Sequence, residues 1–241
     1  MKGFILAAGL GTRLKPWTDH HPKALAPVGG VTMLERIVEK FHKAGITDLT
    51  INCHHFADQI KQYIKEKEWS INIAEEIPEL LETGGAILNA SRYLAGDEPI
   101  LIHNVDILSN ANFKTLGEAH QKTGAMATLL VSDRKSTRKL IFDREERLIG
   151  WHSVSTDEYR PAGFRPETKD IEKAFSGIYV VSPAIINEMK ERGWEGRFSI
   201  MDFFLSTLTD LSYRAHTQDD LSLIDIGKPD SLNRANMLLE K

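Results

Sequence analysis

The 241-residue sequence predicts an α/β fold, a Rossmann-like three-layer sandwich with helices on both faces of a mostly parallel, mixed sheet. Over the first 110 residues, short continuously apolar segments alternate with segments of helical periodicity, which is typical of parallel βαβ units. After residue 124 several strand-like segments follow one another closely and indicate further strands. With 41% hydrophobic residues the chain can bury the core that such a sandwich needs.

The first half alternates strands and helices. A strand is expected at 4–8, and then a helix at 31–44, a strand at 49–53, a helix at 55–67, a strand at 71–74, a helix at 83–94 and a strand at 99–102. The first helix has apolar residues at helical spacing and ends before Gly45. In doubly wound sheets ligands bind at the carboxyl ends of the strands, so residues just after these strands are candidates for a site.

The second half is richer in strands. Strands are expected at 126–131, 139–142, 148–153, 173–181, 213–217 and 221–226, and helices from Pro183, at 199–208 and at 230–239. Residues 155–170 are polar and contain two prolines and a glycine, so they are expected to form a surface loop. The sequence has no repeat and no linker, and we expect residues 1–241 to form one domain.

Composition excludes several classes of function. The net charge of −4 and the pI near 6.1 argue against a nucleic acid as the main partner. Cys53 is the single cysteine, which excludes an internal disulfide and a multi-cysteine zinc site. No apolar run reaches the length of about 18 residues that a membrane span needs, and the N-terminus lacks the cleavage pattern of a signal peptide. A cytoplasmic protein is the default expectation.

A loop that binds phosphate is predicted directly after the first strand. Gly9 and Gly11 allow positive φ and close approach to the backbone, and Thr12 and Arg13 follow at once. Exposed backbone N–H groups form a concavity that binds anions, and a guanidinium adds bidentate charge. Lys23, in a segment stiffened by prolines, would hold a further positive charge against the phosphates.

Two known nucleotide-binding patterns do not match this loop. A dinucleotide-binding loop needs a third glycine where Leu14 stands, and Pro16 stops a helix from starting in the loop. The P-loop pattern of nucleoside triphosphatases is absent. A simple turn without a ligand would explain a lone Gly-x-Gly.

Two aspartates are candidate metal ligands. Asp106 follows the apolar strand at 99–102, and Asp225 follows the apolar residues Leu223 and Ile224 and precedes Gly227. Mg²⁺ is commonly bound by one or two carboxylates together with phosphate oxygens of the substrate. Both carboxylates could therefore converge on one ion, although an aspartate at either place could also be an ordinary loop or capping residue.

The segment Glu82–Gly85 (ETGG) is a candidate contact for a flat ligand. Two glycines at a helix start allow close approach, and the free N–H groups there can donate hydrogen bonds to a ligand. The alternative is a capping turn in which Thr83 is the N-cap residue.

These motifs together resemble those of a known family. LAAGLGTRLKPWT from Leu6, followed by HPKALAPV, which ends at Val28, is similar to the signature of sugar-1-phosphate nucleotidyltransferases. The resemblance implies the nucleotide-diphospho-sugar transferase type of fold, and a reaction that joins a nucleoside triphosphate to a sugar 1-phosphate and releases pyrophosphate. It implies a nucleotide-binding half at 1–110 and a sugar-binding half at 111–241. The ETGG segment is most like that of uridylyltransferases acting on N-acetylmuramate 1-phosphate, followed by mannose-1-phosphate guanylyltransferases.

The resemblance also assigns expected roles. The expected nucleotide-binding residues are Leu6, Ala7, Ala8, Gly9, Gly11, Thr12, Arg13, Lys23, Glu82, Thr83, Gly84 and Asn104. Asn104 and Gly177 are expected at the sugar, Asp106 and Asp225 at Mg²⁺, and Arg13 and Lys23 in catalysis. The chain departs from the family's pattern at Val105, where glycine is usual, and at Lys228, where threonine is common. The family's second lysine has no clear match, and Lys173 is nearest to its place.

The implied mechanism is a single in-line displacement, in which a phosphate oxygen of the sugar 1-phosphate attacks the α-phosphorus. Two alternatives stay open: cytidylyl transfer to phosphocholine, and a regulatory module that binds a nucleotide sugar without turnover. Hexapeptide repeats of an appended acyltransferase domain are not expected. The sequence leaves the base, the sugar and the choice between monomer and homo-oligomer open.

Overall fold

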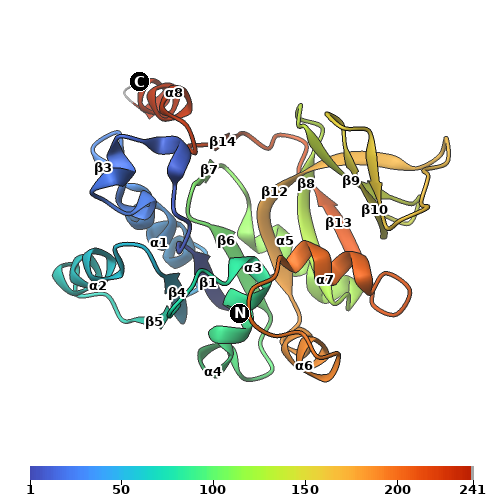
Figure 1. Cartoon of the computed structure of the whole chain (residues 1–241), viewed down its shortest axis with the longest axis horizontal. Helices are drawn as coiled ribbons and strands as arrows, with labels where there is room; N and C mark the ends of the chain where they lie inside the picture. The colour runs from blue at the N-terminus through green and yellow to red at the C-terminus, as the bar shows by residue number, and fades with distance from the viewer. Residues whose placement is uncertain (240–241) are drawn as a thin grey trace.

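The computed structural model describes residues 1–239, with side chains to Met237 (Figure 1). Its strands are β1 (Lys2–Leu6), β2 (Pro27–Val28), β3 (Val31–Thr32), β4 (Leu49–Cys53), β5 (Ile71–Glu75), β6 (Ile100–Asn104), β7 (Ile107–Ser109), β8 (Ala127–Ser132), β9 (Arg138–Phe142), β10 (Leu148–Ser153), β11 (Glu158–Arg160), β12 (Ile171–Val181), β13 (Tyr213–Thr217) and β14 (Leu223–Asp225). Its α-helices are α1 (Met33–Lys43), α2 (Ala57–Glu66), α3 (Glu82–Asn89), α4 (Ser91–Leu94), α5 (Phe113–Thr123), α6 (Ala184–Glu191), α7 (Ile200–Ser206) and α8 (Pro229–Leu239). Short 3₁₀ helices occur at Thr12–Leu14, Trp17–Asp19 and Lys23–Leu25.

One mixed sheet runs through both halves of the chain, in the order β11-β10-β9-β12-β6-β1-β4-β5, with β8 on β12 and β13 on β8. Strands β6, β1, β4 and β5 are mutually parallel, as the alternation of strands and helices predicted. Strand β12 runs antiparallel to β6, β8 and β9, so the parallel pairing outside the first half is limited to β8 with β13. Figure 1 shows the antiparallel strands β9 and β10 on the side opposite α2.

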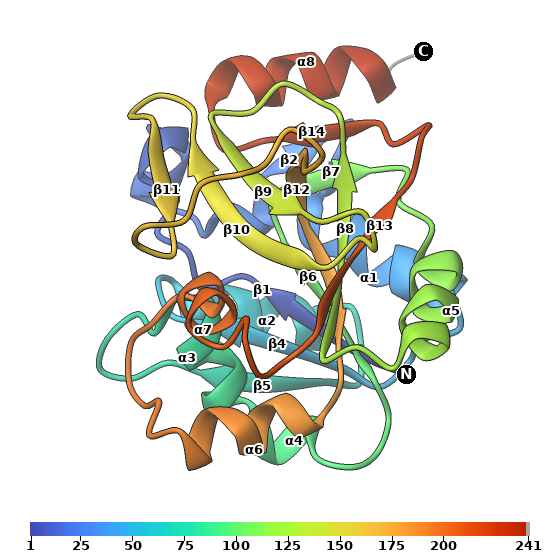
Figure 2. The same ribbon diagram turned by 90° about the vertical axis from the view of Figure 1, so that its right-hand side faces the viewer.

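Helices cover both faces of the sheet, which confirms the α/β three-layer arrangement. Residues of α1, α2 and α5 share one buried apolar cluster, whereas residues of α3, α4, α6 and α7 share the other. Strand residues alternate between the two clusters, as Phe4 and Ile5 do. Figure 2 shows α3, α4, α6 and α7 in the lower half of the view, and α8 across the top.

Helix α1 illustrates how local sequence fixes an element. Its buried residues Leu34, Ile37, Val38 and Phe41 recur at helical spacing, so one face packs on the sheet. The Thr32 side chain accepts a hydrogen bond from the N–H of Glu35 at 3.2 Å and caps the helix.

Some elements differ from the sequence-based expectation. The loop expected at 155–170 contains β11, which pairs with β10. The helix expected at 83–94 is divided into α3 and α4. Helix α5 was not expected, although Asn112 caps its start and Gly124, at φ 60°, ends it. Within residues 1–239, no helix has the length and apolar character needed to cross a membrane.

Candidate active site

The glycine-rich loop follows β1 directly. Gly11 is left-handed, with φ 63°, and a β-carbon placed there would lie 2.8 Å from Thr18 Cγ2. Both the conformation and the lack of space therefore require glycine. A β-carbon at Gly9 would meet nothing within 4 Å, so this part of the loop is open. The 3₁₀ turn that follows leaves Arg13 exposed.

Strand pairing brings Asn104 and Asp106 to the same edge as the loop. Leu6 of β1 stands beside Asn104 of β6, and the N–H of Val105 donates to the Leu6 carbonyl at 3.0 Å. The Lys23 ammonium forms an ion pair with the Asp106 carboxylate. Lys23 is only 7% exposed, so this partner offsets the cost of burying its charge.

Asp225 reaches the site on a separate two-stranded ribbon, β7–β14. It stands beside Ile107 in antiparallel register, and the N–H of Ile226 donates to the Asp106 carbonyl at 3.0 Å. The Asp225 Oδ1 accepts a hydrogen bond from the N–H of Gly227 at 2.7 Å. The two candidate aspartates, far apart in sequence, therefore lie on adjacent backbone segments.

Gly227 marks the point where the charged groups converge. A β-carbon placed there would lie 2.7 Å from Asp225 Oδ1, 3.0 Å from Arg13 Nη2 and 3.3 Å from Lys23 Nζ. All three distances are measured from the same position, so the Asp225 carboxylate, the Arg13 guanidinium and the Lys23 ammonium are close neighbours. Lys23 also forms the ion pair with Asp106. Three separate segments thus contribute two cations and two carboxylates to one cluster.

The charged cluster lies at a cleft of about 470 Å³, called the first cleft here. It is lined by Leu6, Ala8, Gly9, Leu10, Gly11, Thr12, Arg13, Lys23, Asn52, Leu80, Glu82, Thr83, Asn104, Val105, Asp106, Ser199 and Gly227. Ten of the twelve residues expected at the nucleotide lie in this lining, and Ala7 and Gly84 do not. The structure therefore assembles most of the predicted set in one place.

At the start of α3 the N–H groups of the two glycines are not free for a ligand, and Thr83 does not cap the helix. The N–H groups of Gly84 and Gly85 donate to the Phe198 carbonyl at 2.9 and 3.3 Å, so the backbone of the 198 segment occupies them. A β-carbon at Gly84 would lie 2.2 Å from the Phe198 ring, so this glycine serves packing. Thr83 is not the N-cap residue. Its hydroxyl instead accepts a hydrogen bond from the N–H of Ile200 at 2.9 Å and ties α3 to α7.

A buried polar pair, not anticipated from the sequence, supports the first cleft. Asn52 Oδ1 accepts from the N–H of Ala7 at 2.6 Å, and Asn52 Nδ2 donates to Glu76 Oε1 at 2.6 Å. Glu76 Oε2 accepts from the N–H of Leu81 at 2.8 Å. Burial raises the pKa of the Glu76 carboxyl above its usual range. The signal in the sequence was a polar residue inside the apolar strand 49–53, near its carboxyl end.

A second cleft of about 550 Å³ adjoins the first and shares Thr83, Asn104 and Ser199 with it. Its other lining residues are Ile107, Arg134, Ser136, Arg138, Lys139, Leu140, Trp151, Arg160, Phe175, Ser176, Gly177, Tyr179, Ile200, Met201, Asp202, Leu205 and Asp225. Gly177 has φ 75°, and a β-carbon there would lie 2.7 Å from Asn104 Nδ2. Gly177 and Asn104, both expected at the sugar, are therefore in contact at the junction of the two clefts.

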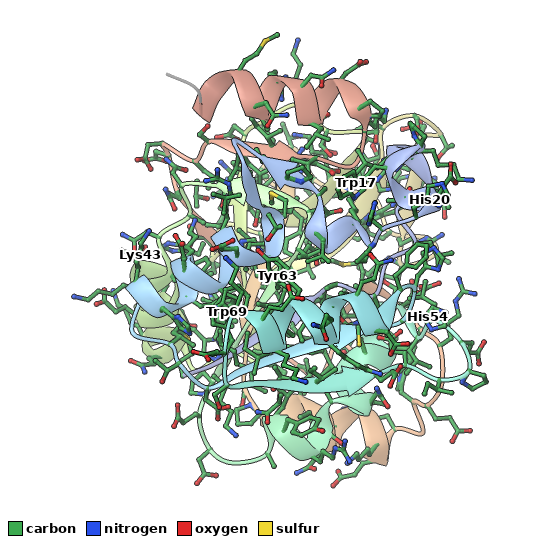
Figure 3. All side chains as sticks on the ribbon, turned by 90° about the vertical axis from the view of Figure 1, so that its left-hand side faces the viewer. Trp17, His20, Lys43, His54, Tyr63 and Trp69 are labelled. Carbon is green, nitrogen blue, oxygen red and sulfur yellow. The ribbon has the colours of Figure 1, made fainter. Side chains whose placement is uncertain are left out.

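Several candidates lie away from the clefts. Lys173 pairs with Asp133 at 2.9 Å and lines neither cleft. Lys228 is exposed and lines neither. His20 and His54 come from loops, and Figure 3 shows both near the edge of the molecule.

The donor set of the charged cluster fits a hard cation. Among the described residues no three side chains of His, Cys, Asp or Glu gather to hold a metal, so an ion here would depend on Asp106 and Asp225 together with substrate oxygens and water. Two carboxylates with room for phosphate oxygens and water match the coordination of Mg²⁺. A structural zinc site would need four ligands, commonly from Cys and His.

The chain is similar to known proteins over most of its length. The family model of nucleotidyl transferases matches residues 2–241. The chain is 28% identical over 211 residues to the N-acetylmuramate alpha-1-phosphate uridylyltransferase of Caulobacter vibrioides, which covers 86% of this chain and 84% of that protein. It is 29% identical over 200 residues to the mannose-1-phosphate guanyltransferase of Aspergillus oryzae, which covers 80% of this chain and 52% of that protein. The chain thus spans about half the length of this second relative.

Solved structures share the fold. HddC from Yersinia pseudotuberculosis, complexed with GMP-PN, superposes with a TM-score of 0.75 at 23% identity over 98% of each chain. The inositol-1-phosphate CTP transferase from T. maritima has a TM-score of 0.75 at 15% identity over 100% of this chain and 95% of that chain. The resemblance drawn from the sequence motifs is confirmed, and the chain belongs to the nucleotidyl transferase family of enzymes.

Proposed function

We propose that this protein is a sugar-1-phosphate nucleotidyltransferase that joins a nucleoside triphosphate to a sugar 1-phosphate and releases pyrophosphate. The observation that carries the proposal is the convergence of Asp225, Arg13 and Lys23 around Gly227, with Asp106 paired to Lys23. This cluster lies where the two clefts adjoin. Transfer of a nucleotidyl group between two bound phosphates requires cationic side chains and carboxylates at the point where the two substrates meet.

The first cleft suits the nucleoside triphosphate. The loop from Gly9 to Thr12 would present backbone N–H groups to the β- and γ-phosphates, and Arg13 would hold the departing pyrophosphate. Lys23 is held against the cluster by burial and by Asp106, so its charge is preorganised for the α-phosphate. Glu82 and Thr83 line the part of the cleft beyond the loop, which we assign to the nucleoside.

Asp106 and Asp225 would hold Mg²⁺. When bound, the ion neutralises charge on the reacting phosphates. The chain's own contribution is to fix the two carboxylates on adjacent backbone segments, through the β7–β14 pairing and the hydrogen bond from Ile226 to the Asp106 carbonyl.

The second cleft suits the sugar 1-phosphate. Asn104 and Gly177 lie at its junction with the first cleft, and Asp225 lines it. A sugar 1-phosphate bound there would reach the α-phosphorus from the side of the second cleft, while pyrophosphate leaves toward Arg13. Because the attacking phosphate and the leaving pyrophosphate would then lie on opposite sides of the α-phosphorus, we expect an in-line displacement without a covalent enzyme intermediate. We favour uridylyl or guanylyl transfer, with an N-acetylmuramate or mannose type of sugar, because relatives with these names align over most of this chain.

The proposal is tested by pyrophosphate release in the presence of Mg²⁺. The common nucleoside triphosphates are crossed with a panel of sugar 1-phosphates and phosphocholine, and products are identified by mass spectrometry. We expect one nucleotide with one sugar 1-phosphate to give pyrophosphate and the matching nucleotide sugar in equal amounts. Turnover of phosphocholine alone would replace the proposal with cytidylyl transfer. Tight nucleotide binding without any product would instead indicate a regulatory binding module.

A further inference from the structure

The second cleft carries more positive charge than a single phosphate requires. Its cationic side chains are Arg134, Arg138, Lys139 and Arg160, and its carboxylates are Asp202 and Asp225. Asp225 belongs to the charged cluster described above and also lies near Arg134, which leaves Asp202 as the carboxylate of this lining for Arg138, Lys139 and Arg160. The first cleft, by contrast, is lined by two cations and two carboxylates.

Arg134 is the cation placed to serve the 1-phosphate. Its Nη2 donates to the Phe175 carbonyl at 2.8 Å, which fixes the guanidinium beside the strand that carries Gly177. Burial lowers the pKa of the Arg134 guanidinium, and the nearby charge of Asp225 opposes part of that shift. Lys139 Nζ donates to the Arg134 carbonyl at 3.0 Å and steadies this segment. With Arg134 assigned to the 1-phosphate, Arg138 and Arg160 have no assigned role.

Arg138 and Arg160 frame one apolar surface of the antiparallel ribbon β9–β11. Alternation along β9 places Arg138 on the same face as Leu140, and Leu140 pairs with Trp151. Trp151 in turn pairs with Arg160, whose guanidinium carbon lies 5.0 Å from the Trp151 ring centre. Arg160 therefore lies over the Trp151 ring, and Arg138 stands on the same face of the ribbon, at the pair with Ser153 further along. Trp151 on this wall of the cleft offers a surface on which a sugar ring can pack. Figure 2 shows this ribbon facing α7.

The two arginines differ in how they are held. Arg160 Nε donates to Glu158 Oε1 at 2.8 Å, and its Nη1 lies 3.6 Å from Asp202 Oδ1. Among the side chains described, which end at Met237, none pairs with the Arg138 guanidinium, and the backbone N–H of Arg138 donates to Ser136 Oγ at 3.3 Å. Arg160 is thus fixed in place, and Arg138 is free to form a bidentate contact with an anion.

Tyr179 provides an independent indication that this cleft receives a polar ligand. Its side chain is 1% exposed and belongs to the lining of the second cleft. Its hydroxyl has no hydrogen-bond partner among the described residues. A buried hydroxyl without a partner is costly, and a polar group of a bound sugar would satisfy it.

We propose that the sugar 1-phosphate used by this enzyme carries a second anionic group, a carboxylate or a phosphate, which Arg138 and Arg160 bind beside Trp151. This inference rests on the function proposed above. Planar guanidinium groups bind either anion through two parallel hydrogen bonds, whereas a neutral sugar would leave the Arg138 charge without a partner. Arg160 is already held by Glu158 and Asp202 and would donate to the same anion from its remaining N–H groups.

The test compares sugar 1-phosphates with and without a second anionic group. Glucose 1-phosphate is compared with glucuronic acid 1-phosphate and glucose 1,6-bisphosphate, and N-acetylglucosamine 1-phosphate with N-acetylmuramate 1-phosphate. We expect at least one acidic member to exceed its neutral counterpart in kcat/KM by about 10-fold or more. The glucuronate and bisphosphate arms separate a carboxylate from a phosphate.

Arginine variants locate the effect. Arg138→Gln should lower kcat/KM for the acidic substrate by about 10- to 100-fold, mainly through KM, and leave the neutral counterpart unchanged. Arg138→Lys should retain part of the preference because it keeps the charge. Arg144→Gln is the matched control, since Arg144 is an exposed arginine beside the other end of β9 and lines neither cleft.

The outcomes separate this inference from the proposed function. Efficient turnover of neutral sugar 1-phosphates in preference to every acidic one would overturn the inference and leave the transferase function standing. An equal loss on acidic and neutral substrates in Arg138→Gln would also overturn it, because it would indicate a structural role. No pyrophosphate with any pair would overturn both.

Discussion

Asn52 Nδ2 donates a hydrogen bond to Glu76 Oε1 at 2.6 Å, and both side chains are buried. Through its other amide atom Asn52 holds the N–H of Ala7, and through its other carboxylate oxygen Glu76 holds the N–H of Leu81. The pair therefore links the strand that leads into the glycine-rich loop with the segment that starts α3. Because the chain neighbours of the two held residues, Leu6, Ala8 and Leu80, line the first cleft, we expect the pair to hold its two walls at a fixed distance.

Asn52→Ala should loosen both walls. The substitution leaves the Ala7 N–H and one Glu76 oxygen without their partner, and we expect a loss of about 1–3 kcal/mol in the free energy of unfolding. We also expect KM for the nucleoside triphosphate to rise more than kcat falls. Urea unfolding and steady-state kinetics measure these effects. Asn72→Ala, on the neighbouring strand, removes a partly exposed side chain and should change neither quantity. If Asn52→Ala and Asn72→Ala had the same free energy of unfolding and the same KM, Asn52 would not link the two walls of the cleft.

Gly227→Ala should impair activity more than stability. The new methyl group would lie 2.7 Å from Asp225 Oδ1 and 3.0 Å from Arg13 Nη2, so these charged groups must move apart. Displacement of a catalytic group by about 1 Å can cost about 10²-fold in rate, and we expect a fall in kcat of that order. Gly117→Ala, in helix α5, is the control for the same chemical change, because its methyl group would meet only the flexible end of Met1. Unchanged kcat in Gly227→Ala would show that this convergence does not matter for turnover.

Cys53 should be unreactive in the native protein. It is fully buried in β4, and burial, followed by the charge of Glu75, raises the pKa of its thiol to about 11. Because the thiolate is the reactive form, a disulfide reagent at pH 8 should modify the thiol only after unfolding in denaturant. Rapid stoichiometric modification without denaturant would show that this part of the sheet opens readily.

Lys40 should make stability depend on alkaline pH. Burial lowers the pKa of its ammonium to about 8, and its Nζ donates to the Ser109 carbonyl at 2.6 Å. Between pH 8 and the unfolded value of 10.5 the unfolded chain binds more protons, so stability relative to Lys40→Met should rise with pH. The expected gain is on the order of 1 kcal/mol. Urea unfolding at pH 7.5, 9 and 10 measures it, and a difference that is constant with pH would contradict the lowered pKa.

The sequence predicted elements best where local signals agreed. Residues 49–53 and 213–217 were predicted with the bounds that the structure gives for β4 and β13. Helix α5 was missed because its apolar face is short, although Asn112 and Gly124 mark both ends. The antiparallel pairing of β12 could not be read from the chain, because an apolar strand gives no sign of its partner's direction.

The residues of the charged cluster could be predicted from the sequence, but the strand pairing that brings them together could not. Arg13, Lys23, Asp106 and Asp225 were recognised from motifs, and three of them do meet around Gly227 with the fourth paired to Lys23. The β7–β14 ribbon that brings Asp225 there was invisible, because its pairing joins segments more than 100 residues apart. The cations of the second cleft were missed for the same reason, since no local pattern tells a solvated arginine from one that lines a cleft.

The most direct test of the account measures Mg²⁺-dependent pyrophosphate release by the wild-type protein, Asp106→Asn and Asp225→Asn on the productive substrate pair. Each substitution keeps the size of the side chain and removes one charged oxygen donor from the cluster. We predict that each lowers kcat by about 10²–10³-fold while the circular dichroism spectrum and the thermal midpoint stay close to wild type. If either variant with an intact fold kept a rate within about threefold of wild type, a value far below the expected loss, the assignment of these two carboxylates to the transfer reaction would be wrong.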